Sequence, residues 1–261
     1  MSYAGAIVDL DGTVYRGGDL VPGARTGIER LRSTGADLLF FSNNPTRDGA
    51  EYAAHLDDLG IPVAPEEALS AGVVTTEYLE REHADDAVLL VGDPGLRDQL
   101  VAADVSLTEE PTNADVLLAS WTQTFGYEDM RRALAVDDDA TFLGTDPDRT
   151  WPAGDGEHAP GSGAIVGAIA SVLDRDPDAF LGKPSPQALA AARSRLGVPP
   201  EDTLVVGDRL ETDLAMGERA GMTTVLVLSG STDRGEVAES AVEPDHVIED
   251  LGAIERVLED A

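Results

Sequence analysis

The stretch "AIVDLDGTV" at residues 6–14 decides the fold, because a short apolar run ends there in two carboxylates, a glycine and a hydroxyl. An apolar run of this length, bounded by turn residues, predicts a buried strand at about residues 4–10. In open parallel sheets, ligands bind at the carboxyl ends of the strands. Asp9 and Asp11 are therefore candidate site residues, with a solvated turn as the alternative in so acidic a chain.

The rest of the chain alternates short apolar runs with amphipathic segments, which is typical of βαβ units and of an α/β fold with a parallel sheet. The Gly/Pro/Asp-rich residues 145–163 are predicted to be a loop. The middle of the chain is interpreted as a second, smaller α/β domain inserted into the first. The predicted strands are 36–42, 87–91, 115–119, 140–144, 203–207 and 223–228, and the predicted helices are 23–34, 46–59, 70–82, 94–102, 126–135, 162–174, 211–220 and 250–259, with a further helix from about Pro186.

The composition argues against nucleic-acid and membrane partners and bears on the cellular location of the protein. The 261 residues carry 18 basic and 50 acidic side chains, a net charge of −32, yet 42% of the residues are hydrophobic, so we expect a folded protein with an acidic surface. Such a surface repels nucleic acid and anionic membranes, and we expect neither as a partner. The chain has no cysteine, and its sequence shows no membrane span or signal peptide, so a cytoplasmic location is expected.

The acidic surface also indicates the solvent in which the protein works. Arginine replaces lysine at 17 of the 18 basic positions, since the chain has a single lysine. At about 1 M salt the Debye length falls to about 3 Å, which screens the self-repulsion of the surface. A GC-rich genome also favours arginine but does not explain the net charge. We therefore interpret the protein as halophilic and expect its activity to rise from low to molar KCl.

Polar side chains follow two further predicted strands. "FSNN" ends the second strand with Ser42 and Asn43, which offer a phosphate cradle or, alternatively, an ordinary helix N-cap. "VVGDRLETD" ends a third strand with Asp208, and Asp213 lies five residues on. Mg²⁺ prefers carboxylate and carbonyl oxygens, so Asp9, the backbone carbonyl of Asp11, and Asp208 are the predicted ligands, unless Asp208 merely caps a helix.

The single lysine, Lys183, lies in "FLGKPSP" between a glycine and a proline. The alternatives are chance, a solvated charge, or a site in which arginine does not fit. A lysine ammonium is a compact point charge, whereas a guanidinium is a wide planar fork. A crowded site that holds a metal, two carboxylates and a phosphoryl group requires the compact cation.

The order D-x-D-G-T, S-N, G-K-P and G-D-x-x-x-T-D resembles the four motifs of the haloacid dehalogenase (HAD) superfamily. "GTDPDRTWP", "PGSGAIVGAI" and "GKPSP" further resemble its subfamily IIA, the NagD-like or p-nitrophenyl phosphatase type. The resemblance implies a Rossmann-like core at 1–80 and 178–261, with an inserted α/β cap of the C2 type at 81–177. It also implies that the cap residue Asp146, where the subgroup usually has asparagine, lies near the substrate, and it is compatible with a homodimer formed through the cap.

The resemblance further implies a Mg²⁺-dependent phosphatase that acts on small phosphomonoesters such as sugar phosphates or nucleoside monophosphates. Asp9 would be the nucleophile that forms an aspartyl-phosphate, and Asp11 the general acid and base. Ser42, Asn43 and Lys183 would hold the phosphoryl oxygens. Gly12 would allow the bend after Asp9, and Asp213 would orient a ligand or a metal-bound water.

Two other functions remain open at the level of the sequence. A phosphomutase uses the same aspartyl-phosphate chemistry, and a non-catalytic metabolite-binding module is the alternative outside the enzymes. Trp121 and Trp151 both fall in the predicted cap, where a place in its core is the expected one. The wall of the leaving-group pocket is the alternative, and Trp151, in the loop after Asp146, is the better candidate for it.

Overall fold

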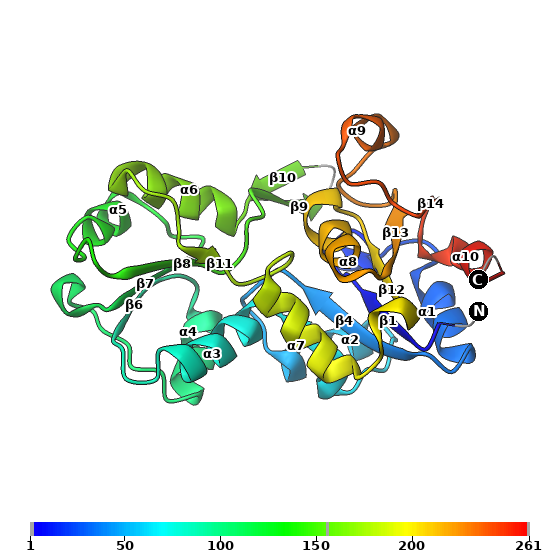
Figure 1. Cartoon of the computed structure of the whole chain (residues 1–261), viewed down its shortest axis with the longest axis horizontal. Helices are drawn as coiled ribbons and strands as arrows, with labels where there is room; N and C mark the ends of the chain where they lie inside the picture. The colour runs from blue at the N-terminus through cyan, green and yellow to red at the C-terminus, as the bar shows by residue number, and fades with distance from the viewer. Residues whose placement is uncertain (1–2, 155–156, 260–261) are drawn as a thin grey trace.

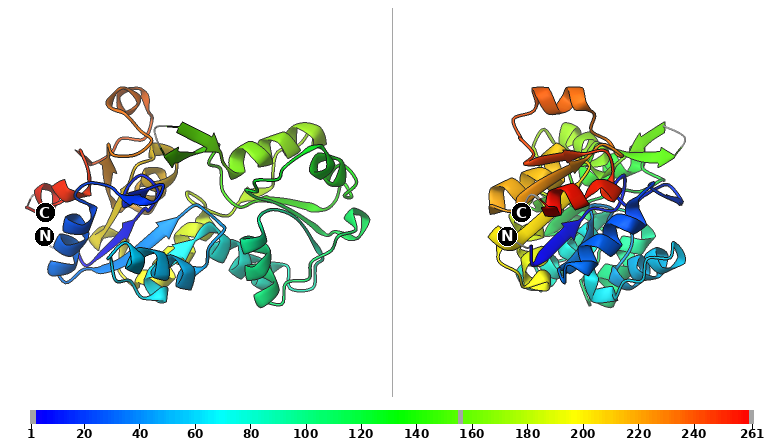
Figure 2. Two further views of the ribbon diagram at one scale, coloured as in Figure 1. Left: turned by 180° about the vertical axis from the view of Figure 1, so that it is seen from behind. Right: turned by 90° about the vertical axis from the view of Figure 1, so that its right-hand side faces the viewer.

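The computed structural model describes residues 3–154 and 157–259. They form two sheets, each made of parallel strands and each with helices on both faces (Figure 1). Both termini lie at the outer end of the larger sheet, far from the smaller one (Figures 1 and 2). The predicted α/β class with a Rossmann-like parallel sheet is confirmed. No helix within the described ranges has the length and apolar character that crossing a membrane requires.

The larger sheet has six parallel strands with β1 near its centre, between β12 and β4. Val8, the last residue of β1, is level with Val206 and Phe40 of those two strands. The ends of the three strands therefore meet at one edge of the sheet. In spatial order the strands are β14 (His246–Ile248), β13 (Thr223–Val227), β12 (Thr203–Gly207), β1 (Gly5–Val8), β4 (Asp37–Ser42) and β5 (Ala68–Ser70).

The side chains of β1 point alternately to the two faces of the sheet, and both faces are buried, which explains why its sequence is apolar throughout. Ala6 and Val8 belong to an apolar cluster with Tyr52, whereas Ile7 belongs to a second cluster with Ala192 on the other face. Strands that are buried on both faces read as continuous apolar runs. The helices around this sheet are α1 (Ala24–Ser33), α2 (Gly49–Asp58), α3 (Ala71–Glu82), α7 (Pro186–Leu196), α8 (Ala215–Ala220), α9 (Arg234–Glu239) and α10 (Glu255–Glu259).

The smaller sheet is built from an inserted segment that runs from β6 to β11, residues 88–180. Its four parallel strands are, in spatial order, β11 (Ala179–Phe180), β8 (Thr141–Gly144), β7 (Val116–Ala119) and β6 (Val88–Val91), and its helices are α4 (Pro94–Ala102), α5 (Tyr127–Ala133) and α6 (Ser162–Leu173). The division into 1–80 with 178–261 and 81–177 stays a prediction, but β11 takes the inserted sheet as far as Phe180.

One apolar cluster joins the two sheets. It contains Leu39 and Val205 of the larger sheet, Leu118 of the smaller one, and Val74 and Leu79 of α3, which lies at the junction. Burial of apolar side chains across the junction stabilises the two parts against each other.

Two antiparallel hairpins extend from the sheets: β2 (Tyr15–Arg16) with β3 (Asp19–Leu20), and β9 (Thr150–Gly154) with β10 (Glu157–Pro160). The prediction that 145–163 is entirely a loop is therefore wrong. Pro, Gly and Asp dominate this stretch and are poor strand formers, but the hairpin gains pairing partners from its own second strand. Residues 211–220, predicted as one helix, form a π-helical turn at Leu210–Leu214 followed by α8.

Candidate active site

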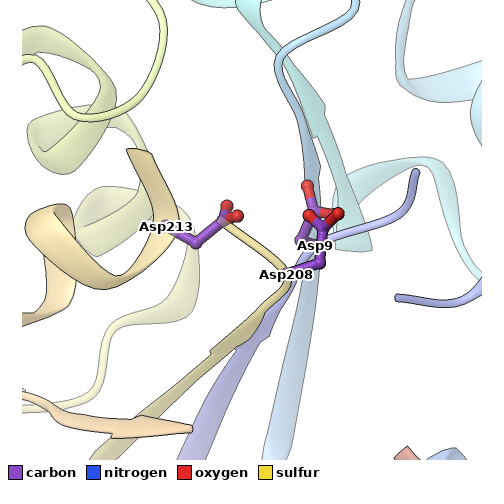
Figure 3. Close-up of side chains that lie close together, drawn as sticks. All are labelled: Asp9, Asp208 and Asp213. Atoms are coloured by element: carbon purple, nitrogen blue, oxygen red, sulfur yellow. The ribbon is translucent and has the colours of Figure 1, made fainter. Parts of the chain in front are cut away.

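Polar side chains from the three central strands of the larger sheet converge at its carboxyl edge. Asp9 follows β1, Ser42 ends β4 and Asp208 follows β12, while Asp213 comes from the π-helical turn. Oxygen atoms of Asp9, Asp208 and Asp213 all lie within 4.8 Å of one another, and all three side chains are buried. Figure 3 shows Asp9 and Asp208 adjacent at the strand ends, with Asp213 directed towards them from the neighbouring turn.

Lys183 lies between two of these carboxylates. Its Nζ donates to Asp9 Oδ1 at 2.7 Å, to Asp213 Oδ1 at 2.6 Å and to the carbonyl of Phe41 at 2.6 Å. An ammonium group has three protons, so these three acceptors use all of them. The side chain is 2% exposed. Burial lowers the pKa of Lys183, but Asp213 and Asp9 outweigh burial and raise this pKa above its ordinary value. Lys183 is therefore a charged group in this site.

Asp9 has one engaged and one unpartnered carboxylate oxygen. Oδ1 accepts from Lys183, whereas Oδ2 is buried and has no hydrogen-bond partner among the described residues. Burial is the largest influence on this carboxyl and raises its pKa, the neighbouring Asp213 raises it further, and Lys183 lowers it. The unpartnered oxygen is thus an atom that the fold keeps available to a ligand.

Asp208 repeats this pattern. Its Oδ2 accepts from the backbone N–H of Ser231 at 2.6 Å, and its Oδ1 is buried without a partner among the described residues. Burial, followed by repulsion from Asp213, raises the pKa of Asp208 to about 7. A Cβ on Gly230 would lie 2.0 Å from Asp208 Oδ2, so only glycine lets this loop approach the carboxylate.

The two unpartnered oxygens fit a divalent cation. Leaving a buried carboxylate oxygen unpaired is costly, and a hard cation satisfies it with a bond that no neighbouring side chain supplies. The carboxylate of Asp11 is not in the three-residue cluster found in the described ranges. The predicted ligand at that residue is its backbone carbonyl, which stays a prediction.

The carboxylate of Asp11 contacts Ser42 at the end of β4. Its Oδ2 accepts from Ser42 Oγ at 3.1 Å, and Ser42 Oγ in turn accepts from the hydroxyl of Tyr52 at 3.1 Å. Burial raises the pKa of Asp11, and the bond from Ser42 lowers it. Gly12 has a φ of +94°, and a Cβ there would lie 2.4 Å from Asp208 Oδ2, so glycine both permits the bend and admits Asp208.

Asn43 clamps the backbone of Lys183. Its Oδ1 accepts from the Lys183 N–H at 2.8 Å, and its Nδ2 donates to the Lys183 carbonyl at 3.1 Å. Ser42 and Asn43, predicted to hold phosphate, therefore hold Asp11 and Lys183 in this structure. Asp213, predicted as a supporting residue, contacts Lys183 and accepts from the backbone N–H of Arg209 at 3.3 Å.

A cavity of about 160 Å³ lies between this sheet edge and the inserted segment. The sheet edge supplies Asp9, Asp11, Ser42, Asn43, Lys183, Asp208 and Asp213, among others, and the inserted segment supplies Trp121, Asp146, Asp148, Trp151, Pro152, Gly161 and Ser162. The predicted site residues that carry functional side chains therefore line one space. That space is closed on one side by residues far from them in sequence.

The wall formed by the inserted segment is aromatic and acidic. The rings of Trp121 and Trp151 meet edge to face, with centroids 6.4 Å apart, and both residues line the cavity. Contact of Trp151 with the leaving group stays a prediction. Asp146 is buried and accepts from Thr145 Oγ1 at 3.1 Å and from the Asp148 N–H at 3.2 Å. Burial and then the nearby Asp148 raise the pKa of Asp146 to about 8.

Sequence reasoning missed Asp148 and Arg209 as cavity residues, and for Trp121 it favoured the core of the cap over the cavity wall. Asp148 lies two residues after Asp146, and Arg209 directly follows Asp208, so adjacency to a motif is the signal that would have drawn attention to both. Trp121 follows a strand end of the inserted segment, and no local pattern distinguishes it from a core residue.

Residues 6–106 match a family described as haloacid dehalogenase-like hydrolase, and residues 180–254 match one described as HAD-hydrolase-like. The sugar-phosphatase AraL of Bacillus subtilis is 33% identical over 261 residues, which cover 100% of this chain and 95% of the relative.

Among solved structures, the p-nitrophenyl phosphatase from Archaeoglobus fulgidus has a TM-score of 0.89 and 31% identity, with 100% of both chains covered. NagD from E. coli K-12 has a TM-score of 0.84 and 28% identity, with 97% and 99% covered. The glycerol phosphate phosphatase Rv1692 from Mycobacterium tuberculosis, in complex with magnesium, has a TM-score of 0.85 and 29% identity, covering 98% of this chain and 76% of that one.

Proposed function

The chain belongs to the haloacid dehalogenase-like hydrolases and is a phosphatase of the NagD-like type, and on this premise we propose that it hydrolyses small phosphomonoesters with Mg²⁺ through an aspartyl-phosphate on Asp9. The observation that carries the proposal is the pair of unpartnered buried oxygens, Asp9 Oδ2 and Asp208 Oδ1, beside the fully engaged Lys183. Asp9, Asp208 and Lys183 all line the cavity of about 160 Å³.

Asp9 is the proposed nucleophile. One of its oxygens attacks phosphorus and forms an O–P bond while the bond from phosphorus to the leaving oxygen breaks. Attack requires the ionised carboxylate, and Lys183 at 2.7 Å favours that form against the burial that opposes it. Asp213 shares the same ammonium group, which keeps Lys183 charged and in place.

Asp11 is the proposed general acid and base. Its raised pKa keeps a proton available, which it gives to the leaving oxygen as the ester bond breaks. In the second step it takes a proton from water as the water oxygen attacks phosphorus, and the bond to Asp9 breaks to release phosphate. Ser42 holds the carboxyl of Asp11 in one orientation for both transfers.

Asp9 and Asp208, with the backbone carbonyl of Asp11, are the proposed Mg²⁺ ligands, and Asp213 lies close enough to orient a ligand or a bound water. When bound, the cation neutralises the developing charge on the phosphoryl oxygens. The relative from M. tuberculosis was solved with magnesium, which supports the choice of metal. We also propose that Ser42, Lys183 and Asn43 contact phosphoryl oxygens in the substrate complex, Asn43 through its backbone N–H because both of its side-chain N–H groups are engaged.

The substrate is proposed to be a small ester such as a sugar phosphate. The cavity of about 160 Å³ suits a small leaving group, and relatives are named for sugar phosphates and glycerol phosphate. The charge pattern supports a salt-rich cytoplasm, where we expect the rate to peak in molar KCl; a peak below about 0.1 M would contradict that assignment. A homodimer through the inserted segment stays a prediction.

The test is release of inorganic phosphate from p-nitrophenyl phosphate with Mg²⁺, comparing the natural chain with Asp9→Asn. The variant keeps the shape of the side chain but removes the nucleophilic oxygen, so we expect loss of at least about 10⁴-fold in kcat. Equal rates in the two proteins would exclude the mechanism. Recovery of an isomeric sugar phosphate instead of free phosphate would indicate a phosphomutase.

A further inference from the structure

Asp148 belongs to the inserted segment, in the loop between β8 and β9, but its carboxylate lies against the strand ends of the larger sheet. Its Oδ2 accepts from Asn43 Nδ2 at 3.3 Å, and its Oδ1 lies 3.8 Å from Nη1 of Arg209. Arg209 also donates from Nη2 to the carbonyl of Thr150 at 2.7 Å. Three polar contacts therefore join the inserted segment to the sheet edge beside the cavity.

The contact with Asp148 adds to the two bonds to Lys183 that fix which way the amide of Asn43 is turned. The two N–H groups of Asn43 donate to the Lys183 carbonyl and to Asp148, and its oxygen accepts from the Lys183 N–H. If the amide were reversed, its oxygen would face the carboxylate of Asp148, and like-charged acceptors repel. Asp148 thus favours the one orientation in which Asn43 clamps the backbone of Lys183.

Lys183 connects this clamp to the reacting carboxylate. Its backbone is held by Asn43, and its ammonium group contacts both Asp9 and Asp213. A shift of the Lys183 backbone moves the cation relative to both carboxylates, and shifts of about 1 Å at such a site cost up to about 100-fold in rate.

We propose that Asp148 is a positioning residue that completes the active site only when the inserted segment is seated, because it orients Asn43 and, through Asn43, Lys183. This inference rests on the proposed function. The competing interpretation is that Asp148 occupies the place of a phosphoryl oxygen at Asn43 and Arg209, and is displaced by the substrate.

Asp148→Ala and Asp148→Asn separate the two interpretations. With p-nitrophenyl phosphate we expect kcat to fall by about tenfold in the alanine variant and by about threefold in the asparagine variant, which still accepts a weaker bond from Asn43. Inorganic phosphate should inhibit both variants no more tightly than it inhibits the natural chain. Asp138→Ala, an exposed acid of the same segment, is the control and should change neither quantity.

Tighter inhibition by phosphate together with a lower KM in Asp148→Ala would overturn the proposal in favour of displacement. An unchanged kcat in both variants would overturn it as well. Because the asparagine variant keeps the shape of the side chain, its smaller loss decides the question if the alanine variant does not fold.

Hydrogen exchange at the backbone amides of residues 181–183 and 185 gives a readout that needs no catalysis. We expect faster exchange in Asp148→Ala and in Asn43→Ala, and no further acceleration when the two changes are combined, since they break one chain of contacts. Unchanged exchange in Asp148→Ala would contradict the proposal. If the natural chain hydrolysed no phosphomonoester, the proposed mechanism would fail while this readout still tested the coupling.

Discussion

The two walls of the cavity are built in different ways. The sheet wall, which contains Asp9, Asp208 and Lys183, takes its side chains from adjacent parallel strand ends and from one loop that these ends hold in place. The inserted wall, which contains Trp121 and Trp151, takes its side chains from loops and a hairpin. Strand register fixes the first wall to the precision that bond making requires, whereas the second can vary without disturbing the sheet.

This difference implies that the sheet wall performs the chemistry at phosphorus and that the inserted wall sets substrate preference. A change in the sheet wall should slow the reaction with every substrate, because the same phosphorus chemistry is performed each time. A change at Trp121 or Trp151 of the inserted wall should alter the ranking of substrates, because we expect only the leaving group to reach these rings. Asp148 of the same wall is the exception, since it contacts Asn43 of the sheet wall.

Asp11→Asn should give the largest loss among the changes that leave the nucleophile in place, about 10² to 10⁴-fold in kcat. The loss should be greater for glycerol phosphate than for p-nitrophenyl phosphate, because an alkoxide needs a proton more than a nitrophenolate does. Steady-state rates with the two esters measure this. An equal loss with both esters would show that Asp11 does not protonate the leaving group.

Lys183→Arg should lower kcat by about 100-fold with all substrates while circular dichroism shows a folded protein. Lys183 is buried, and its ammonium group is surrounded by three acceptors at 2.6 to 2.7 Å, so a planar guanidinium cannot match them. Near-normal kcat in the variant would mean that charge alone, and not its compact shape, is needed here.

The sheet wall is also the part that the sequence predicts best. Asp9, Asp208 and Ser42 each lie at the end of an apolar run, and the rule that parallel strands end at one edge brings them together without further information. The loop carrying Lys183 was found through its composition, because this lysine is the only one in the chain.

The inserted wall was predicted less well, for a physical reason. The β9–β10 hairpin is stabilised by pairing with itself and not by an apolar pattern, so residues 145–163 read as a loop. Asp148 and Arg209 form an ion pair although they lie 61 residues apart in the sequence. An ion pair between distant loops leaves no periodic signal in the sequence. Only the spatial arrangement shows that these residues share a cavity.

Trp151→Ala should raise KM by about tenfold for esters with bulky leaving groups and should change kcat little. Inhibition by inorganic phosphate, which has no leaving group, should be unchanged. An equal loss in kcat for every ester would show that Trp151 acts on the chemical step, as the sheet wall does, and would contradict the distinction between the two walls.

Asp146→Asn should have the smallest effect on rate and a pH-dependent effect on stability. The folded pKa of about 8 lies above the ordinary 3.8, so the folded state holds the proton more tightly and stability falls as pH rises from about 4 to 8. Asparagine has no such proton, so the variant should gain stability relative to the natural chain over that range. Melting temperatures measured across it would contradict this if their difference were constant.

The most direct test of the account is to trap the phosphorylated protein. Asp11→Asn lacks the base for the second step, whereas the nitrophenolate of p-nitrophenyl phosphate leaves without a proton in the first. After mixing with this ester and Mg²⁺ and quenching in acid, the variant should therefore carry one phosphoryl group on the peptide that contains Asp9, with none in Asp9→Asn. A phosphoryl group on another peptide, or no labelled protein during measurable turnover, would contradict the claim that Asp9 attacks phosphorus.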